Sequence, residues 1–365
     1  MKSISIIKEK AAGEQRVILT PREIALLVKA GYNVIVEKGA GENVGIPDKS
    51  YAEAGAKIAS TKEAWTASKL IIKYKPPVDE EFQYLDKDKV LCAVFHAEGN
   101  PGLVKKLLKS KAEVYSYEFF RTKEGVFPLS VASSELAGQI AVIYGAYHLQ
   151  VHLGGSGKLL APVVNAQPLK VLVIGYGNAG GAAARLASAM GGEVVVLGTN
   201  KEKLRAFQAA MPSGTRCYVN TPDVLEREIR SADLVIGAIL ISTYDTKPII
   251  TEKMVKSMKP GAMIIDVTSG YGPGYIATFD RETSFKEPTF KKYGVLHCKI
   301  DTLPLAYPST TVDAMSQHLF PYLLDLAASV YDPTLVNDTA EAGKIVENGK
   351  IVHREVKRHF EHYTK

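Results

Sequence analysis

Short apolar runs alternate with amphipathic segments along the first 120 residues. The apolar runs have the length of buried strands and cover residues 3–8, 33–37, 70–74, 90–95 and 113–119. Between them, apolar side chains recur at helical spacing in residues 21–30, 50–54, 61–67 and 102–110. Thr20 and Pro21 have the character of a helix start, and Gly31 that of a helix end. This alternation predicts a parallel sheet flanked by helices.

The same alternation resumes at Leu169. A long apolar helical pattern over residues 133–152 precedes it, followed by a glycine-rich stretch at 154–157 that we expect to link two domains. The later strand-like runs cover residues 171–174, 193–197, 215–218, 234–238, 263–266 and 295–298. Residues 312–330 are helical in pattern, and Asn348 with Gly349 predicts a hairpin before a short basic helix. We therefore expect an α/β fold with two Rossmann-like, doubly wound parallel-sheet domains.

Length and composition agree with this expectation. A chain of 365 residues suggests about two domains, and no apolar run reaches the ~18 residues of a membrane span. The apolar stretch in the first residues is too short to be the core of a signal peptide. Cys92, Cys217 and Cys298 lack disulfide or metal spacing, so we expect free thiols, buried at Cys92 and Cys298, in a reducing cytoplasmic setting. The net charge of +6 is mild and interspersed, which disfavours a nucleic-acid partner.

The strongest local motif lies in residues 171–190. An apolar strand runs into Gly175-x-Gly177-x-x-Gly180, a helix follows, and a second strand covers residues 193–197. Glycines permit a tight turn and a close approach of pyrophosphate, while the helix N-terminus offers N–H groups to the phosphates. Because the right strand and helix surround the glycines, we interpret the motif as a dinucleotide site. The alternative is a glycine turn needed only for packing.

The end of that second strand bears on the choice of nucleotide. NAD enzymes usually carry a carboxylate there that binds the ribose hydroxyls, whereas this chain has Gly198, Thr199 and Asn200. Without the carboxylate a 2′-phosphate is no longer repelled. The segment also offers cationic side chains: Lys201, Lys203 and Arg205. We therefore predict NADP(H) over NAD(H), the alternative being a site that simply holds the ribose more weakly.

Further motifs lie along nearly the whole chain, at residues 15–21, 72–76, 95–96, 134–138, 232–238, 258–261 and 320–324. Together they resemble those of the alanine dehydrogenase, transhydrogenase α-subunit and saccharopine dehydrogenase superfamily. The resemblance implies a substrate domain (residues 1–129 and 306–365), an NAD(P)-binding domain (residues 130–305) and a cleft between them. Together with the glycine motif it gives these expected cofactor contacts: Ser134, Gly175, Gly177, Asn178, Ala179, Gly180, Gly198, Thr199, Asn200, Lys203, Ala238, Ile239 and Leu240.

The resemblance also gives roles to three residues of the substrate domain. Arg16 matches the arginine that binds the substrate carboxylate, for which its planar fork is suited. Lys75 matches the lysine that contacts the oxo acid and polarises the reacting carbonyl or imine. His96 matches the general acid/base, and histidine exchanges protons near neutral pH. Taken alone, these residues would be interpreted as a solvated arginine, a solvated strand edge at Lys73 and Lys75, and a structural histidine.

Two departures from the alanine dehydrogenase pattern bear on the substrate. Alanine dehydrogenases carry a catalytic aspartate shortly after the strand that here ends in Asp266, and Gly270 occupies the matching place. Residues 300–304 are more like the Ile-Asp-x-Leu-Pro of saccharopine dehydrogenases, which makes Asp301 a candidate substrate-binding group, or alternatively a cap of the following turn. The room at Gly270 predicts a substrate larger than alanine.

The expected reaction is hydride transfer between a nicotinamide and the amine or imine carbon next to a carboxylate. It would be carried out by an amino-acid dehydrogenase or imine reductase acting on an amino acid or oxo acid, with closure of the two domains excluding water. An opine-forming secondary-amine dehydrogenase is an alternative, and a non-catalytic nucleotide-binding subunit is another of a different class. We expect a homo-oligomer with no metal, membrane or nucleic-acid partner.

Overall fold

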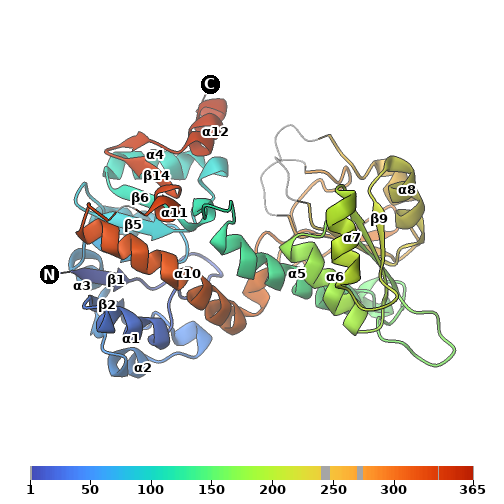
Figure 1. Cartoon of the computed structure of the whole chain (residues 1–365), viewed down its shortest axis with the longest axis horizontal. Coiled ribbons are helices and arrows are strands. Elements are labelled where there is room, and N and C mark those ends of the chain that lie inside the picture. Colours follow the sequence, from blue (N-terminus) through green and yellow to red (C-terminus); the bar gives the residue numbers. More distant parts are fainter. Residues whose placement is uncertain (1, 240–246, 269–273, 336, 365) are drawn as a thin grey trace. The chain divides into compact units, whose positions relative to one another are not determined.

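The chain forms two compact units, which the computed structural model describes over residues 2–239, 247–268, 274–335 and 337–364 (Figure 1). The first unit comprises Met1–Ser133 and Tyr307–Lys365, and the second comprises Ser134–Ala306. Each holds one largely parallel sheet flanked by helices, which confirms the predicted fold class. Residues 154–157 lie within the second unit, so the prediction that they link the domains is wrong. Gly155 instead packs closely against the backbone of Leu149. A Cβ added to Gly155 would lie only 2.3 Å from the carbonyl carbon of Leu149.

The first unit contains an eight-stranded sheet in the order β15-β14-β6-β5-β4-β1-β2-β3. Strands β1 to β6 are parallel and follow the 3-2-1-4-5-6 order of Rossmann folds, whereas β14 pairs antiparallel with β6. Its strands are β1 (Ser3–Ile6), β2 (Asn33–Glu37), β3 (Lys57–Ala59), β4 (Leu70–Ile72), β5 (Val90–Ala93), β6 (Glu113–Ser116), β14 (Lys344–Glu347) and β15 (Lys350–Ile351).

Two apolar cores lie on the two faces of this sheet. Helices α1 (Pro21–Lys29), α2 (Asp48–Glu53) and α10 (Pro308–Tyr331) cover one face. Helices α3 (Thr61–Thr66), α4 (Pro101–Ser110) and α12 (Arg354–Thr364) cover the other. The remaining helical turns of this unit are η1 (Glu42–Val44), η2 (Asp79–Tyr84), η3 (Ala97–Gly99), η4 (Tyr117–Phe119) and α11 (Asp338–Glu341).

The second unit repeats the same strand order in a seven-stranded sheet, β12-β13-β11-β10-β7-β8-β9, with β12 antiparallel at one edge. Its strands are β7 (Lys170–Ile174), β8 (Glu193–Gly198), β9 (Arg216–Val219), β10 (Leu234–Gly237), β11 (Met263–Asp266), β12 (Phe290–Lys292) and β13 (Val295–Cys298). Its helices are α5 (Pro128–His148, which starts in the first unit), η5 (Val151–Leu153), α6 (Asn178–Ala189), α7 (Lys201–Ala209), α8 (Pro222–Ser231), α9 (Glu252–Lys256) and η6 (Leu303–Ala306).

Several local predictions are confirmed. Asn348 and Gly349 have φ values of 50° and 70°, as a two-residue hairpin between β14 and β15 requires. Cys92 and Cys298 are buried. A separate finding concerns membranes: within the described ranges, the structure has no helix that combines the length and the apolarity of a membrane span.

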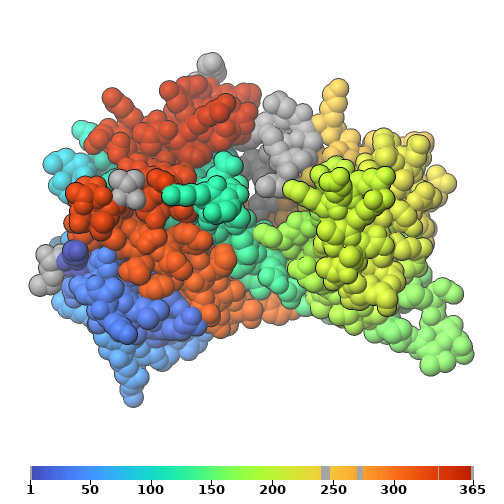
Figure 2. Space-filling model, viewed as in Figure 1, coloured from blue at the N-terminus to red at the C-terminus, as the bar shows by residue number. Residues whose placement is uncertain are grey.

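A segment before β7 stands out from the body of the second unit (Figure 2). Apolar side chains on it are exposed to solvent, among them Leu159, Val163 and Val164, of which Val164 is 88% exposed. Apolar surface of this kind often packs against other protein.

Glycine at position 138 lets helix α5 touch the start of helix α6. A Cβ on Gly138 would lie 2.0 Å from the carbonyl oxygen of Ala179, and this backbone atom has little freedom to move away. The close packing of α5 therefore contributes to the placement of the first turn of α6.

We predict that Gly138→Ala destabilises the protein by about 1–3 kcal/mol, because the added methyl overlaps backbone. Thermal unfolding should show a melting temperature lower by roughly 2–10 °C. Gly102→Ala in α4 is the matched control, since its Cβ would meet only Asn100 at 3.7 Å. Equal melting temperatures for Gly138→Ala and the wild type would show that α5 and α6 do not approach this closely.

Candidate active site

The candidate substrate site lies at the carboxyl ends of β1, β4, β5 and β6. These strands are parallel neighbours, so the segments that follow them meet at one edge of the sheet. The structure brings two predicted residues together there: Lys75 Nζ lies 3.1 Å from His96 Nε2. Both side chains are partly exposed, as a group that contacts substrate requires.

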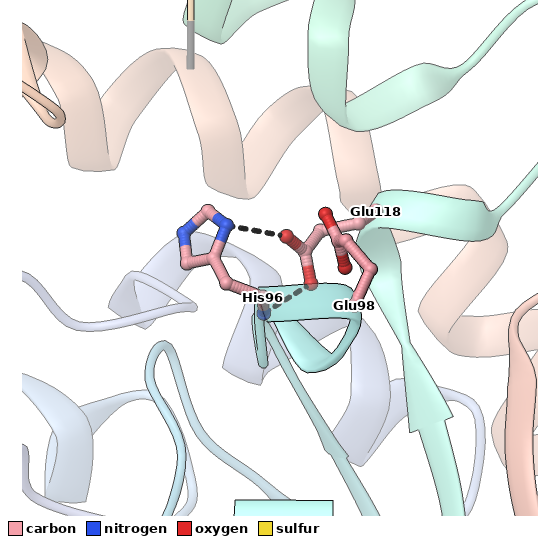
Figure 3. A group of neighbouring side chains, drawn as sticks. All are labelled: His96, Glu98 and Glu118. Atoms are coloured by element: carbon pink, nitrogen blue, oxygen red, sulfur yellow. Dashed lines mark hydrogen bonds and ion pairs between the residues drawn. The ribbon is translucent and has the colours of Figure 1, made fainter. Parts of the chain in front are cut away.

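Glu118 holds the imidazole of His96 in place (Figure 3). Its Oε1 lies 2.8 Å from His96 Nδ1, and its Oε2 accepts hydrogen bonds from the backbone N–H groups of Phe95 (2.8 Å) and His96 (2.9 Å). Ser116 Oγ donates to the same oxygen at 2.7 Å. Burial alone would raise the pKa of Glu118, but the neighbouring His96 and these hydrogen bonds lower it to about 2. The carboxylate therefore stays ionised.

This network assigns the protonation of the histidine. The ionised Glu118 accepts a hydrogen bond from Nδ1–H, so the neutral ring keeps its lone pair on Nε2, where the Lys75 ammonium donates to it. His96 also has φ 45° and ψ 44°, in the left-handed region that non-glycine residues seldom adopt. Such strain persists where surrounding bonds enforce it. Here the two consecutive N–H groups bound by Glu118 enforce it.

Arg16 is buried rather than solvated. Its Nε and Nη2 donate to the two carboxylate oxygens of Glu14 at 2.7 and 2.6 Å, and its Nη1 donates to the hydroxyl of Tyr74 at 3.0 Å. The guanidinium also lies over the Tyr74 ring, 4.0 Å from its centroid. These bonds use three of the five N–H groups and leave two, one on Nη1 and one on Nη2, for a carboxylate.

Lys73 does not form a solvated strand edge with Lys75, so that interpretation is wrong. Strand β4 ends at Ile72, and the Lys73 side chain is fully buried. Its Nζ lies 3.2 Å from Glu81 and 3.7 Å from Glu9, which compensates the buried charge. Lys73 is thus a structural ion-pair partner, while Lys75 reaches the histidine.

His96, Glu98 and Glu118 each place one ligand atom within 4.8 Å of the others, as a metal site could. Figure 3 shows the three side chains around the start of η3. The carboxylate of Glu118 already binds His96 Nδ1 and accepts three further donors, so the cluster is explained by orientation of the histidine. No other group of this kind occurs among the residues that the structure describes.

In the second unit the three glycines form a close-packed turn. Gly175 has φ +100°, and a Cβ there would lie 2.3 Å from the carbonyl oxygen of Ala238. A Cβ on Gly180 would lie 2.0 Å from the carbonyl oxygen of Gly175. Open space adjoins Gly177, which begins helix α6 without a side-chain cap. Helix α6 thus starts with first-turn N–H groups, among them those of Asn178 and Ala179, that no N-cap side chain occupies, which is the arrangement that binds phosphate at helix N-termini.

The other predicted cofactor residues lie on neighbouring segments of the same unit. Thr199, Asn200 and Lys203 follow β8, Ala238 and Ile239 follow β10, and Ser134 lies on α5. The carbonyl oxygen of the Asn200 side chain accepts from the backbone N–H of Lys203 at 2.9 Å, so this oxygen caps helix α7. Leu240 lies outside the described residues.

The substrate prediction also rests on Asp301 and Gly270. Asp301 is exposed, and its Oδ2 accepts from Thr302 Oγ1 at 3.2 Å just before η6. Gly270 lies outside the described residues. Asp266, at the end of β11, is buried and accepts from the backbone N–H of Thr268 and the hydroxyl of Tyr275. Burial raises the pKa of Asp266.

Sequence reasoning missed Glu14, Tyr74 and Glu118. Glu118 stands at the end of a predicted strand, as His96 does, and this shared position was an available signal. Glu14 lies two residues before Arg16, but nothing local indicates that its side chain turns back onto the guanidinium.

The fold and the glycine turn define a dinucleotide-binding protein with a polar site on a second Rossmann-like sheet. Comparison with known proteins narrows this class. The models "Alanine dehydrogenase/PNT, N-terminal domain" and "Alanine dehydrogenase/PNT, C-terminal domain" match residues 5–137 and 141–354. The alanine dehydrogenase of Methanococcus maripaludis is 34% identical over 99% of this chain and 97% of that protein. That of Bacillus subtilis is 35% identical over 97% of this chain and 94% of that protein.

Solved structures agree with these sequence matches. An L-alanine dehydrogenase superposes with a TM-score of 0.92 at 30% identity and 99% coverage of both chains. A transhydrogenase from Sinorhizobium meliloti gives a TM-score of 0.81 over 96% of this chain and 99% of that one, and at 21% identity it shows a shared fold. The chain belongs to the alanine dehydrogenase/PNT family. It is an amino-acid dehydrogenase, an oxidoreductase that acts on CH–NH₂ donors with a pyridine nucleotide.

We predict that Glu118→Gln lowers kcat/KM for the amino acid by roughly 10²–10⁴-fold. The amide would donate to His96 Nδ1, which moves the ring proton to Nε2 and removes the lone pair that faces Lys75. Steady-state kinetics near neutral pH measure this effect.

The control for this prediction is Glu80→Gln, which removes a surface carboxylate paired with Lys10 and should leave kcat/KM unchanged. A Glu118→Gln enzyme with wild-type kcat/KM would show that the tautomer of His96 is irrelevant to the rate.

Proposed function

We propose that the protein catalyses reversible, nucleotide-linked oxidative deamination of a small L-α-amino acid, with alanine and pyruvate as the first pair. The observation that carries this proposal is the Lys75–His96–Glu118 chain, in which an ammonium, an imidazole and a carboxylate contact one another in sequence. The relatives that match the whole chain are named alanine dehydrogenases, which supports the same substrate.

Each of these groups has a distinct task in the proposed mechanism. The two remaining N–H groups of Arg16 bind the substrate carboxylate, and Glu14 keeps the guanidinium in a fixed orientation. Lys75 donates a hydrogen bond to the oxygen or nitrogen on the reacting carbon. His96 Nε2 takes the proton released in deamination and returns it in the reverse reaction. A bound nicotinamide would supply the hydride acceptor or donor.

For the nucleotide we propose NAD(H) as the working cofactor. The comparisons give no support for the NADP(H) preference predicted from Gly198. The missing carboxylate also has a packing explanation, because a Cβ at position 198 would lie 2.0 Å from the ring of Tyr176. The absence of an acidic side chain is therefore not evidence of a dedicated 2′-phosphate site.

A substrate larger than alanine is the second candidate, which we retain because of Gly270 and residues 300–304. The comparisons do not support it, and the structure does not describe Gly270. An opine-type secondary amine belongs to the same candidate, because it also needs room beyond the carboxylate.

One substrate panel separates these proposals. NADH and NADPH oxidation are measured with pyruvate and with larger oxo acids, each with ammonia or with an amino acid as the amine. We expect pyruvate with ammonia and NADH to give the highest kcat/KM. Efficient turnover only with a larger oxo acid would favour the second candidate, and dependence on an amino acid in place of ammonia would favour an opine reaction.

We predict that Arg16→Lys raises the KM for the amino acid by about 10–100-fold, because a point charge cannot bind a carboxylate bidentately. The KM for the nucleotide should not change, since Arg16 belongs to the first unit. Arg22→Lys, at an exposed arginine of α1, is the control. An unchanged KM for the amino acid with Arg16→Lys would assign Arg16 a purely structural role with Glu14.

A further inference from the structure

Tyr176 occupies the space above the end of strand β8. It is the residue between Gly175 and Gly177, and its ring atoms would lie 2.0 and 2.3 Å from a Cβ on Gly198. The two positions therefore depend on each other: the ring fits only because residue 198 has no side chain. Gly198 is the position at which NAD-binding Rossmann folds place the carboxylate that binds the ribose.

The Tyr176 ring is anchored on one side and open on the other. It packs near Phe207 of α7, with ring centroids 5.7 Å apart, and is partly exposed. Its hydroxyl donates to the carbonyl oxygen of Asn200 at 3.3 Å, an exposed bond that follows the end of β8. Packing alone would be satisfied by phenylalanine, whereas the hydroxyl places a polar group where the ribose of a bound nucleotide is expected.

We propose, resting on the nucleotide use stated above, that Tyr176 replaces the ribose-binding carboxylate and binds the ribose of NADH without excluding NADPH. The phenol is neutral and can both donate and accept a hydrogen bond. It can therefore accept from a 2′-hydroxyl, as a carboxylate does, but it does not repel a 2′-phosphate. The pair of Tyr176 and Gly198 thus makes a site that favours NADH modestly, through the hydrogen bond from the 2′-hydroxyl, and does not exclude NADPH.

Cationic side chains on helix α7 also help the site to accept a 2′-phosphate, but only weakly. Lys201, Lys203 and Arg205 are exposed, as is Glu202 among them. Exposed charges of this kind are screened by salt and contribute modestly. The contact made by the tyrosine hydroxyl is therefore the specific element of the site.

The test measures binding of NADH and NADPH to the full-length protein by nucleotide fluorescence, which needs no turnover, together with the melting temperature. The wild type should bind both nucleotides within about tenfold of each other. Tyr176→Phe should keep the melting temperature and weaken NADH by about 3–10-fold, because one neutral hydrogen bond is lost. Tyr293→Phe is the control, since it removes an exposed hydroxyl that bonds Glu252 in the same unit.

A pair of variants tests the mutual dependence. Gly198→Asp alone should lower the melting temperature or weaken both nucleotides, because the new side chain overlaps the Tyr176 ring. Adding Tyr176→Ala should restore NADH binding and disfavour NADPH by about 100-fold, because a carboxylate now faces the 2′-phosphate.

Three outcomes would overturn the proposal. Tyr176→Phe and Tyr176→Ala could bind both nucleotides like the wild type. Gly198→Asp alone could be as stable as the wild type and already selective for NADH. The wild type could reject NADPH by more than about 100-fold. Wild-type binding of neither nucleotide would overturn the proposed function as well, whereas the expected binding without amino-acid turnover would support Tyr176 and overturn only that function.

Discussion

Parallel pairing of β1 with β4 and of β7 with β10 is the constraint on which both candidate sites depend. At each pairing the strand order reverses, so the helices that follow the two strands cover opposite faces of the sheet and leave the strand ends accessible to a ligand. In the first unit, Arg16 and Lys75 follow the two strands of this pair. In the second unit, the glycine turn and Ala238 do so.

Buried carboxylates hold the polar groups of the candidate site in the first unit in fixed positions. Arg16 and Glu14 are almost completely buried, where an ion pair is weakly screened and where removal of one partner would leave an uncompensated charge. Glu118 similarly binds two consecutive N–H groups and the ring of His96. These bonds are formed before any substrate arrives, so little reorganisation is needed when it binds.

The sequence predicts strands well where apolar residues form a continuous run. Strands β2, β11 and β13 have the predicted bounds. Strands β3 and β12 were missed because each has only three residues at or near a sheet edge and carries lysine. Lys75 and His96 could be predicted from the family resemblance, which their positions at strand ends support, whereas neither residue would stand out alone. The contact of Tyr176 with Gly198 could not be predicted. The two residues lie at the ends of different strands, and no local sequence pattern indicates that they pack together.

The connectivity of the first unit has a consequence for synthesis on the ribosome. Strand β14 pairs with β6, and helix α10 covers one face of the sheet, yet both follow the whole second unit in the chain. During translation the sheet edge at β6 and the apolar face beneath α10 remain uncovered while residues 134–306 emerge. The second unit is continuous and can fold first, whereas the first unit is completed only when the last segment arrives. The nascent first half is therefore the stage at which this protein is most exposed to aggregation.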